Sequence, residues 1–164
     1  MAIKKIKPQP GQESVWDYPR PPVAEATTKH IRILTGGITL ASTNRSVRVL
    51  ETSHPPVYYL PMADIRMEYL TVHSQQSFCE FKGAARYYNI QVGNKEIQQA
   101  GWYYPNPNER FALLKNHVAF YPQLMDACYV NDELVQPQPG GFYGGWITSD
   151  VVGPFKGGPG TWGW

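Results

Sequence analysis

The chain has 164 residues, of which 42% are hydrophobic and 17% are charged, and its formal net charge is +2. This length fits one domain with a core of its own, and the small charge gives no sign of the clustered basic face that nucleic-acid binding requires. Aromatic residues are the unusual class, at 13% with 11 tyrosines, and tyrosine is enriched at interfaces and on ligand-binding walls.

The sequence also gives no sign of a membrane protein or a metalloprotein. No apolar run approaches the roughly 18 residues of a transmembrane helix, and no apolar segment follows the N-terminal lysines, so we expect neither a membrane span nor a secretory signal. Cys79 and Cys128 form no C-x-x-C pair and the histidines have no ligand spacing, so we expect no metal and no cofactor. We therefore predict a cytoplasmic protein in which both cysteines are thiols.

The N-terminal segment, residues 1–22, is predicted to be an irregular arm. Its prolines remove backbone donors and fix backbone angles, which discourages regular structure. They lie at Pro8, Pro10, Pro19, Pro21 and Pro22. Trp16 and Tyr18 are expected to hold this arm against the body of the protein.

The next part, residues 23–136, shows the alternation and turn signals of an antiparallel β domain. Strands are predicted at 31–34, 38–41, 47–51, 57–60, 77–81, 85–92, 97–104, 118–121 and 127–130. The turns between them are expected at Gly36-Gly37, Thr43-Asn44, Lys82-Gly83, Gly93-Asn94 and Asn131-Asp132. One or two short helices are expected, one after Pro61 and one at 109–114 that is capped by Asn108. The pattern predicts a mainly β fold in a single compact domain.

The composition changes in the last segment, residues 137–164. This segment holds nine of the chain's 15 glycines together with Trp146, Trp162 and Trp164. Glycine content alone favours a flexible tail, and a disordered terminus is one interpretation. Flexible linkers rarely carry three tryptophans, so we predict an ordered but irregular extension that packs on the domain or on a partner subunit.

The first candidate site follows the strand predicted at 47–51. Four side chains capable of chemistry lie within seven residues, namely Arg48, Glu51, Ser53 and His54. Two prolines follow at once, and a stiff turn suits a preorganised site. Glu51 and His54 are predicted to act as a general acid/base pair, with Arg48 and Ser53 binding the ligand. The alternative is a structural strand end in which Glu51 pairs with Arg48 or Lys82.

The second candidate site is Cys79 together with Lys82, at the end of the strand predicted at 77–81. A cation near a thiol favours the thiolate, which is the nucleophilic form. Side chains alternate along a strand, so these two would point to opposite faces unless a bulge or turn at Lys82-Gly83 brings them together. A buried structural cysteine is the alternative. Lys82 itself is predicted to donate to an anionic or carbonyl group.

Aromatic side chains are expected to wall a pocket beside these two clusters. The rings assigned to ligand binding are Tyr59, Tyr88, Trp102, Tyr104 and Tyr121. Aromatic walls with a few convergent polar groups are typical of small-molecule sites. Only about half of the rings on any one strand can face the same side, so the others are expected in the core.

Taken together, these motifs resemble the domain-of-unknown-function family 427. The resemblance runs from about residue 13 to residue 135 and rests on these motifs: Leu50-Glu51-Thr-Ser-His54-Pro-Pro-Val-Tyr-Tyr59-Leu-Pro61, Cys79-x-x-Lys82-Gly83-x-Ala85-x-Tyr-Tyr88, Ala100-x-Trp102-x-Tyr104-x-x-Pro107 and Val118-Ala-Phe-Tyr121. It implies a tent-like (Mss4-like) β fold. It also implies a site made of Glu51, His54, Tyr59, Cys79, Lys82 and Trp102. The paired C-x-x-C knuckles that hold zinc in other tent-like proteins are absent from this sequence, so no zinc site is implied.

These observations lead to one preferred function and two alternatives. We expect a pocket that binds a small polar molecule, with general acid/base chemistry as a further role. The first alternative is a thiol-dependent enzyme that uses Cys79. The second is an assembly protein in which residues 137–164 dock a partner or form a homo-oligomer.

Overall fold

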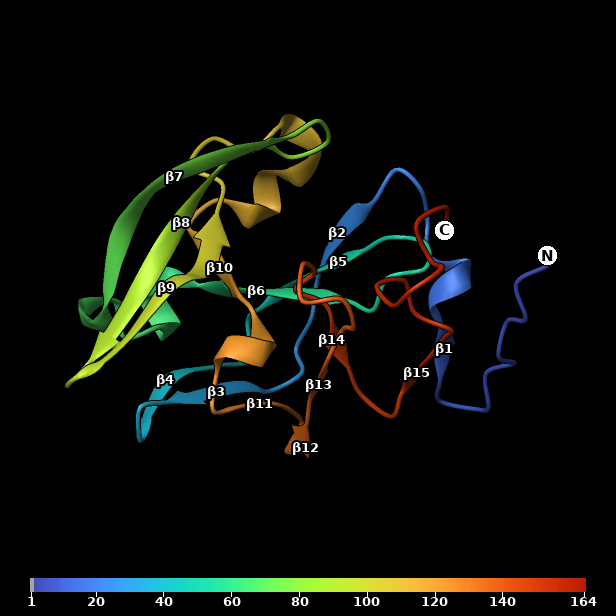
Figure 1. The fold of residues 1–164 in the computed structure, drawn as a ribbon, viewed down its shortest axis with the longest axis horizontal. Helices are drawn as coiled ribbons and strands as arrows, with labels where there is room; N and C mark the ends of the chain where they lie inside the picture. The colour runs from blue at the N-terminus through green and yellow to red at the C-terminus, as the bar shows by residue number, and fades with distance from the viewer. Residues whose placement is uncertain (1) are drawn as a thin grey trace.

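The computed structural model describes residues 2–164 and confirms a mainly β, mostly antiparallel fold. The larger sheet has seven strands, all antiparallel to their neighbours. Its order is β2 (Val23–Ala26), β5 (Val47–Leu50), β6 (Val57–Pro61), β10 (His117–Phe120), β9 (Lys95–Tyr103), β8 (Gly83–Val92) and β7 (Leu70–Cys79). The long strands β7, β8 and β9 arch away from the rest of the molecule (Figure 1).

A second sheet of four strands lies below the larger one in Figure 1. Its order is β12 (Glu133–Leu134), β11 (Ala127–Val130), β3 (Ile31–Thr35) and β4 (Ile38–Thr43). The main core contains buried side chains from both sheets, among them Ile33 and Leu40 from the smaller sheet and Phe120 from the larger. The two sheets therefore form packed layers around a shared apolar interior.

The larger sheet has a second apolar face, and strand β6 shows how residues are divided between the two. Tyr58 and Leu60 belong to the main core, whereas Tyr59 and the half-buried Val57 belong to a separate cluster with Phe111. This alternation follows from the two-residue period of a strand. The candidate site forms on this second face.

The turns that link the strands follow the predicted chemistry. Gly36 and Gly37 both have positive φ, at 60° and 80°, between the paired residues Thr35 and Ile38. Two positive φ angles give the mirror-image turn whose twist suits a two-residue hairpin. Asn131 and Asp132 make the corresponding turn between β11 and β12, with φ of 47° and 67°.

The short helices are all of the tighter 3-10 type. They are η1 (Val15–Asp17), η2 (Met62–Asp64), η3 (Met67–Tyr69), η4 (Glu109–Leu114) and η5 (Pro122–Leu124). The single helix predicted after Pro61 is in fact the pair η2 and η3. Asn108 holds the predicted N-cap position of η4, but its side chain donates to the Phe81 carbonyl at 2.8 Å and makes no capping hydrogen bond.

The main error in strand prediction concerns β7, which begins at Leu70 and not at residue 77. Most of its side chains between Thr71 and Phe78 are exposed. This strand lies at the edge of the sheet and is polar on both faces, so it lacks the alternation by which strands are found in a sequence.

The last segment of the chain packs on the body of the protein, as an extension beside the two sheets. It contains β14 (Trp146–Ile147), which pairs with β13 (Gln136–Pro137), and β15 (Val151–Val152), which pairs in parallel with β1 (Glu13–Ser14) of the N-terminal arm. The Trp146 side chain is fully buried. Both chain ends therefore lie on the same side of the molecule (Figure 1).

Arg48 anchors the N-terminal arm to the larger sheet. Its guanidinium donates to the Glu13 carboxylate at 2.9 and 3.0 Å and to Glu25 at 2.6 Å. Tyr18 donates to the same Glu13 carboxylate at 2.8 Å. The hydrogen bond from Arg48 is the main reason why the pKa of Glu13 lies below its usual value. Arg48 thus has a structural partner at each end of its guanidinium.

We predict that Arg48→Met lowers the free energy of unfolding by about 2 kcal/mol, because it leaves two carboxylates without the largely buried cation that joins them. Arg45→Met is the matched control, since Arg45 pairs with Asp64 through a side chain that is 66% exposed. Water screens that pair, so its loss should lower the free energy of unfolding clearly less than the loss of Arg48. Urea denaturation measures the free energy of unfolding of both variants. If Arg48→Met lowers it no more than Arg45→Met does, Arg48 does not anchor the N-terminal arm.

Candidate functional site

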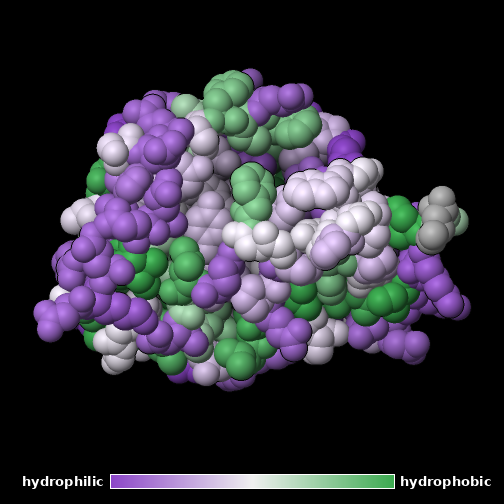
Figure 2. Space-filling model, in the orientation of Figure 1, coloured by the Kyte–Doolittle hydropathy of each residue, from purple (hydrophilic) through white to green (hydrophobic). Residues whose placement is uncertain are grey.

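Two adjoining cavities lie on the second face of the larger sheet, where Figure 2 shows the surface hollowed near its centre. The first, here named the lysine cavity, has a volume of about 410 Å³ and is lined by two lysines. The second, the glutamine cavity, has a volume of about 650 Å³ and is lined by three glutamines. Both cavities share the side chains of Cys79, Trp102, Tyr104, Tyr121 and Phe142.

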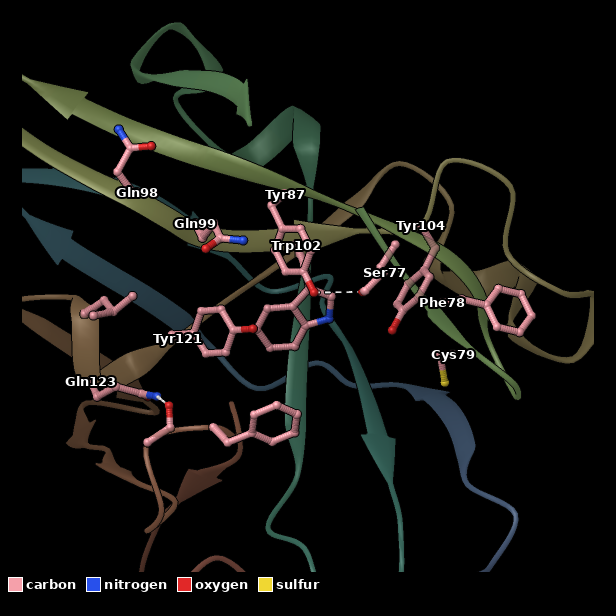
Figure 3. Close-up of a pocket in the computed structure, with 14 residues that line it drawn as sticks. Ser77, Phe78, Cys79, Tyr87, Gln98, Gln99, Trp102, Tyr104, Tyr121 and Gln123 are labelled. Atoms are coloured by element: carbon pink, nitrogen blue, oxygen red, sulfur yellow. Dashed lines mark hydrogen bonds between the residues drawn. The ribbon is translucent and has the colours of Figure 1, made fainter. Parts of the chain in front are cut away.

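The aromatic wall comes from Tyr59 on β6, Trp102 on β9, and Tyr104 and Tyr121, which directly follow β9 and β10. The Trp102 indole N–H donates to the Tyr59 hydroxyl at 3.1 Å, and the Trp102 and Tyr121 rings lie 4.6 Å apart between centroids. Figure 3 shows these last two rings side by side at the centre of the site. Burial raises the pKa of Tyr59 and Tyr104, and raises that of Tyr121 to about 12. All three are therefore neutral phenols at physiological pH.

His54 and Glu51 stand at the end of strand β5. The Nδ1 atom of His54 lies 2.9 Å from the Thr52 carbonyl. A carbonyl only accepts, so Nδ1 carries the proton and Nε2 is left as an acceptor. Burial is the main cause that lowers the pKa of His54, with Lys156 and Arg20 adding to it and Thr52 and Glu51 opposing it. His54 is therefore a neutral base near pH 7.

Lys82 and Cys79 meet at the turn between β7 and β8. Cys79 pairs with Gly83 across the end of the hairpin, and the Lys82 ammonium lies 3.7 Å from the Cys79 sulfur. The strand has ended before Lys82, so the alternation that would separate the two side chains no longer applies. The turn is held by the Asn108 N–H, which donates to the Lys82 carbonyl at 2.9 Å.

The extension supplies the opposite wall of the lysine cavity. Its lining side chains and backbone come from Gln138, Phe142, Tyr143, Gly144 and Lys156. The Tyr143 ring meets the His54 ring edge-on, with 5.5 Å between centroids. A Cβ atom at Gly144 would lie 2.3 Å from Cη2 of Trp102, so only glycine lets the extension approach the indole this closely.

The structure brings eight of the eleven predicted site residues together around the lysine cavity. They are Glu51, His54, Tyr59, Cys79, Lys82, Trp102, Tyr104 and Tyr121. Arg48, Ser53 and Tyr88 do not line either cavity. Arg48 is engaged by Glu13 and Glu25 instead.

Local structure explains why Ser53 and Tyr88 do not line either cavity. Ser53 is fully buried with a positive φ of 72°, and its backbone bonds Val15 and Lys156. Tyr88 is turned into the main core, where it stacks on Tyr103 at 4.4 Å. Its neighbour Tyr87 faces the glutamine cavity and bonds Ser77 at 2.8 Å, as the dashed line in Figure 3 shows.

Several lining residues are not among the eleven that the sequence analysis assigns to the site. Strand parity favours Tyr87 over Tyr88, because Ala85 and Tyr87 share the face that lines the site. The pattern Gly140-Gly-Phe-Tyr-Gly-Gly145 marks the loop that supplies Phe142 and Tyr143. The glutamines Gln98, Gln99 and Gln123 carry no such signal, since glutamine is common on any exposed strand or loop.

Residues 2–164 contain neither a metal-binding cluster nor a membrane-spanning helix. No group of three or more His, Cys, Asp or Glu side chains converges there in a way that could hold a metal ion. None of the helices in this range is long and apolar enough to cross a bilayer.

Comparison with known families supports the resemblance seen in the motifs. The family model described as "Domain of unknown function (DUF427)" matches residues 23–131, which is more than half of the chain. The protein therefore belongs to the DUF427 family. No curated protein matches the sequence. The matched region contains β2 to β11 and ends before the extension.

We predict that His54 makes stability depend on pH below its ordinary pKa of 6.5. His54 binds a proton at a higher pH in the unfolded chain than in the folded chain. The stability that neutral His54 contributes to the fold is therefore fully present above about pH 6.5, and it is lost as the pH falls through the lowered pKa of the folded state. In His54→Asn the side-chain amide can still donate to the Thr52 carbonyl, but the variant has no imidazole that takes up a proton in this pH range. The stability difference between wild type and variant should therefore shrink between about pH 7 and pH 5.

Urea denaturation across that range measures the difference. His117→Asn controls for the loss of a ring, because the Nδ1 atom of His117 likewise lies 2.8 Å from the carbonyl two residues earlier, at Lys115. A difference in the free energy of unfolding between the wild type and His54→Asn that stays constant with pH would contradict the prediction.

Proposed function

We propose that this DUF427 protein binds a small, planar, polar molecule in the lysine cavity. Its aromatic wall would contact the faces of the molecule, and Lys82, Glu51 and His54 would fix its polar groups. The observation that carries this proposal is the convergence of both predicted polar clusters on one cavity, with Glu51 and His54 from one cluster and Cys79 and Lys82 from the other.

The size and chemistry of the cavity support this function. Its volume of about 410 Å³ falls within the range of roughly 300–1,000 Å³ that is usual for small-molecule pockets. Trp102 and Tyr121 offer flat apolar surfaces that suit a planar ring. The polar groups are few and differ in kind, as expected where orientation must be specified.

The polar groups also suit proton transfer. Lys82 can donate, the Glu51 carboxylate can accept, and the Nε2 atom of His54 is a free acceptor near pH 7. A neutral imidazole close to a bound ligand is suited to general-base catalysis. We therefore include acid/base chemistry on the ligand in the proposal, with His54 as the base.

We predict that Val57→Phe abolishes binding of small planar probes, because Val57 lines the lysine cavity and a ring at this position would fill it. The probes are nicotinate, nicotinamide, benzoate and benzamide. NMR titration of the tryptophan indole N–H signals measures binding.

Val72→Phe is the matched control, since Val72 is 52% exposed on β7 and lines neither cavity. This control should bind the probes as the wild type does, and thermal unfolding verifies that both variants fold. If none of the four probes binds the wild type, or if Val57→Phe binds them unchanged, the proposed function is wrong.

A second candidate function is favoured by one specific contact, the 3.7 Å approach of the Lys82 ammonium to the Cys79 sulfur. A lysine beside a thiol is a feature of many nucleophilic cysteines. Cys79 lines both cavities and is half-buried, so a small electrophile can reach it. A thiol-dependent enzyme would use Cys79 in the same site.

We predict that Lys82→Met slows alkylation of Cys79 by iodoacetamide about threefold to tenfold at neutral pH. Cys128 is buried, and burial raises its pKa to about 12, so the native protein should react at Cys79 alone. Lys95→Met is the control, since Lys95 pairs with Asp126 on the surface. Equal rates in the wild type and Lys82→Met would count against thiol chemistry, as would a wild-type rate no faster than that of glutathione.

The remaining expectations stay proposals. Assembly through residues 137–164 is supported by the exposed side chains of Trp162 and Phe142, whereas Trp146 is already buried in the chain's own body. The free thiols of Cys79 and Cys128 fit a cytoplasmic location. The tent-like (Mss4-like) class rests on the family resemblance.

A further inference from the structure

We propose that the lysine cavity selects an aromatic carboxylate, and that the extension sets this selectivity through Lys156. The inference rests on the proposed function and goes beyond it in two respects, because it names the charge of the ligand and assigns a binding residue outside the region that the family model matches.

The Lys82 ammonium carries a positive charge that no carboxylate neutralises. Among residues 2–164 it forms no ion pair, and its polar contact is the Cys79 sulfur at 3.7 Å. It also lies 5.6 Å from the centroid of the Phe111 ring. Two of its three N–H groups are therefore available to a ligand.

Lys156 brings a second ammonium to the same cavity from the extension. Its backbone is fixed on both sides, since its N–H donates to the Ser53 carbonyl at 2.9 Å and its carbonyl accepts from the Gln138 side chain at 2.8 Å. Its ammonium donates to a main-chain oxygen of Trp164, the last residue of the printed sequence, at 3.1 Å, and forms no ion pair with an Asp or Glu side chain of residues 2–164. Lys156 is thus positioned, and no side-chain carboxylate neutralises it.

The other charges around the cavity leave a positive excess. Glu51 is the one carboxylate among its described lining residues, and Glu51 is shared with Arg20, whose Nε lies 3.8 Å from it. Two lysines therefore line the cavity against one side-chain carboxylate, which Arg20 partly neutralises. Aromatic walls exclude water and strengthen the attraction of such a site for an anion.

The rest of the lining restricts which anion fits. Trp102 and Tyr121 present ring faces, and the phenol hydroxyls of Tyr59 and Tyr104 are uncharged. A ligand with one or two planar rings and a carboxylate at its edge satisfies both the rings and the lysines. A neutral amide of the same shape could contact the aromatic rings but could not form an ion pair with the lysines.

Matched pairs of probes test the selectivity. Nicotinate and nicotinamide differ in charge but hardly in shape, as do benzoate and benzamide. We expect the wild type to bind each carboxylate at least about tenfold more tightly than its amide, which corresponds to about 1.4 kcal/mol. Titration followed by the tryptophan indole N–H signals in NMR gives both affinities.

Variants at Lys156 test the assignment. Lys156→Met should reduce the preference for the carboxylate to about threefold or less while the amide affinity is unchanged, and Lys156→Arg should retain it because the charge is kept. Lys115→Met is the control, since Lys115 is exposed and lines neither cavity. Thermal unfolding verifies that each variant is folded.

The outcomes separate this inference from the proposed function. If amides bind the wild type as tightly as carboxylates, or if Lys156→Met keeps the full preference, the inference is wrong and the proposed function stands. If no probe of either charge binds, both are wrong.

Discussion

The contact between Gly144 and the Trp102 indole is the constraint on which the candidate site depends. Trp102 belongs to the family-matched domain and lines both cavities, whereas Gly144 belongs to the extension. With a Cβ atom at Gly144 only 2.3 Å from the indole, any other residue would push the two parts of the molecule away from each other. The lysine cavity is closed on one side because this approach is allowed.

The rest of the extension is arranged to keep this contact in place. Gln138 is buried, donates to the Lys156 carbonyl and accepts from the Gly145 N–H. Gly140 and Gly157 touch backbone to backbone, and a Cβ atom on Gly140 would lie 2.2 Å from the Gly157 carbonyl oxygen. These glycines suggest flexibility in the sequence, but in the structure they allow two backbone segments of the extension to pack directly against each other. The same side-chain and backbone contacts position Lys156, on which the proposed ligand charge depends.

Strands, turns and the location of the site could be predicted because each has a local cause. Alternation and glycine turns determine β3 and β4 within residues 31–43, and the segment from Glu51 to His54 is a single turn. Other features depend on distant partners. Arg48 has the chemistry of a ligand-binding residue, and only the folded structure shows that Glu13 of the N-terminal arm and Glu25 of the neighbouring strand β2 engage it. The three tryptophans indicate that the extension is ordered, but not that it forms a wall of the cavity.

The most direct test of the central claim, that the lysine cavity holds a small ligand, is native mass spectrometry of the protein purified from its own host. The Lys82→Ala variant, prepared in the same way, is the comparison. A small molecule that remains on the wild type and is absent from the variant is the predicted result, and its mass would identify its chemical class. A wild type with the bare mass of the chain, or a molecule that the variant retains equally, would contradict the claim.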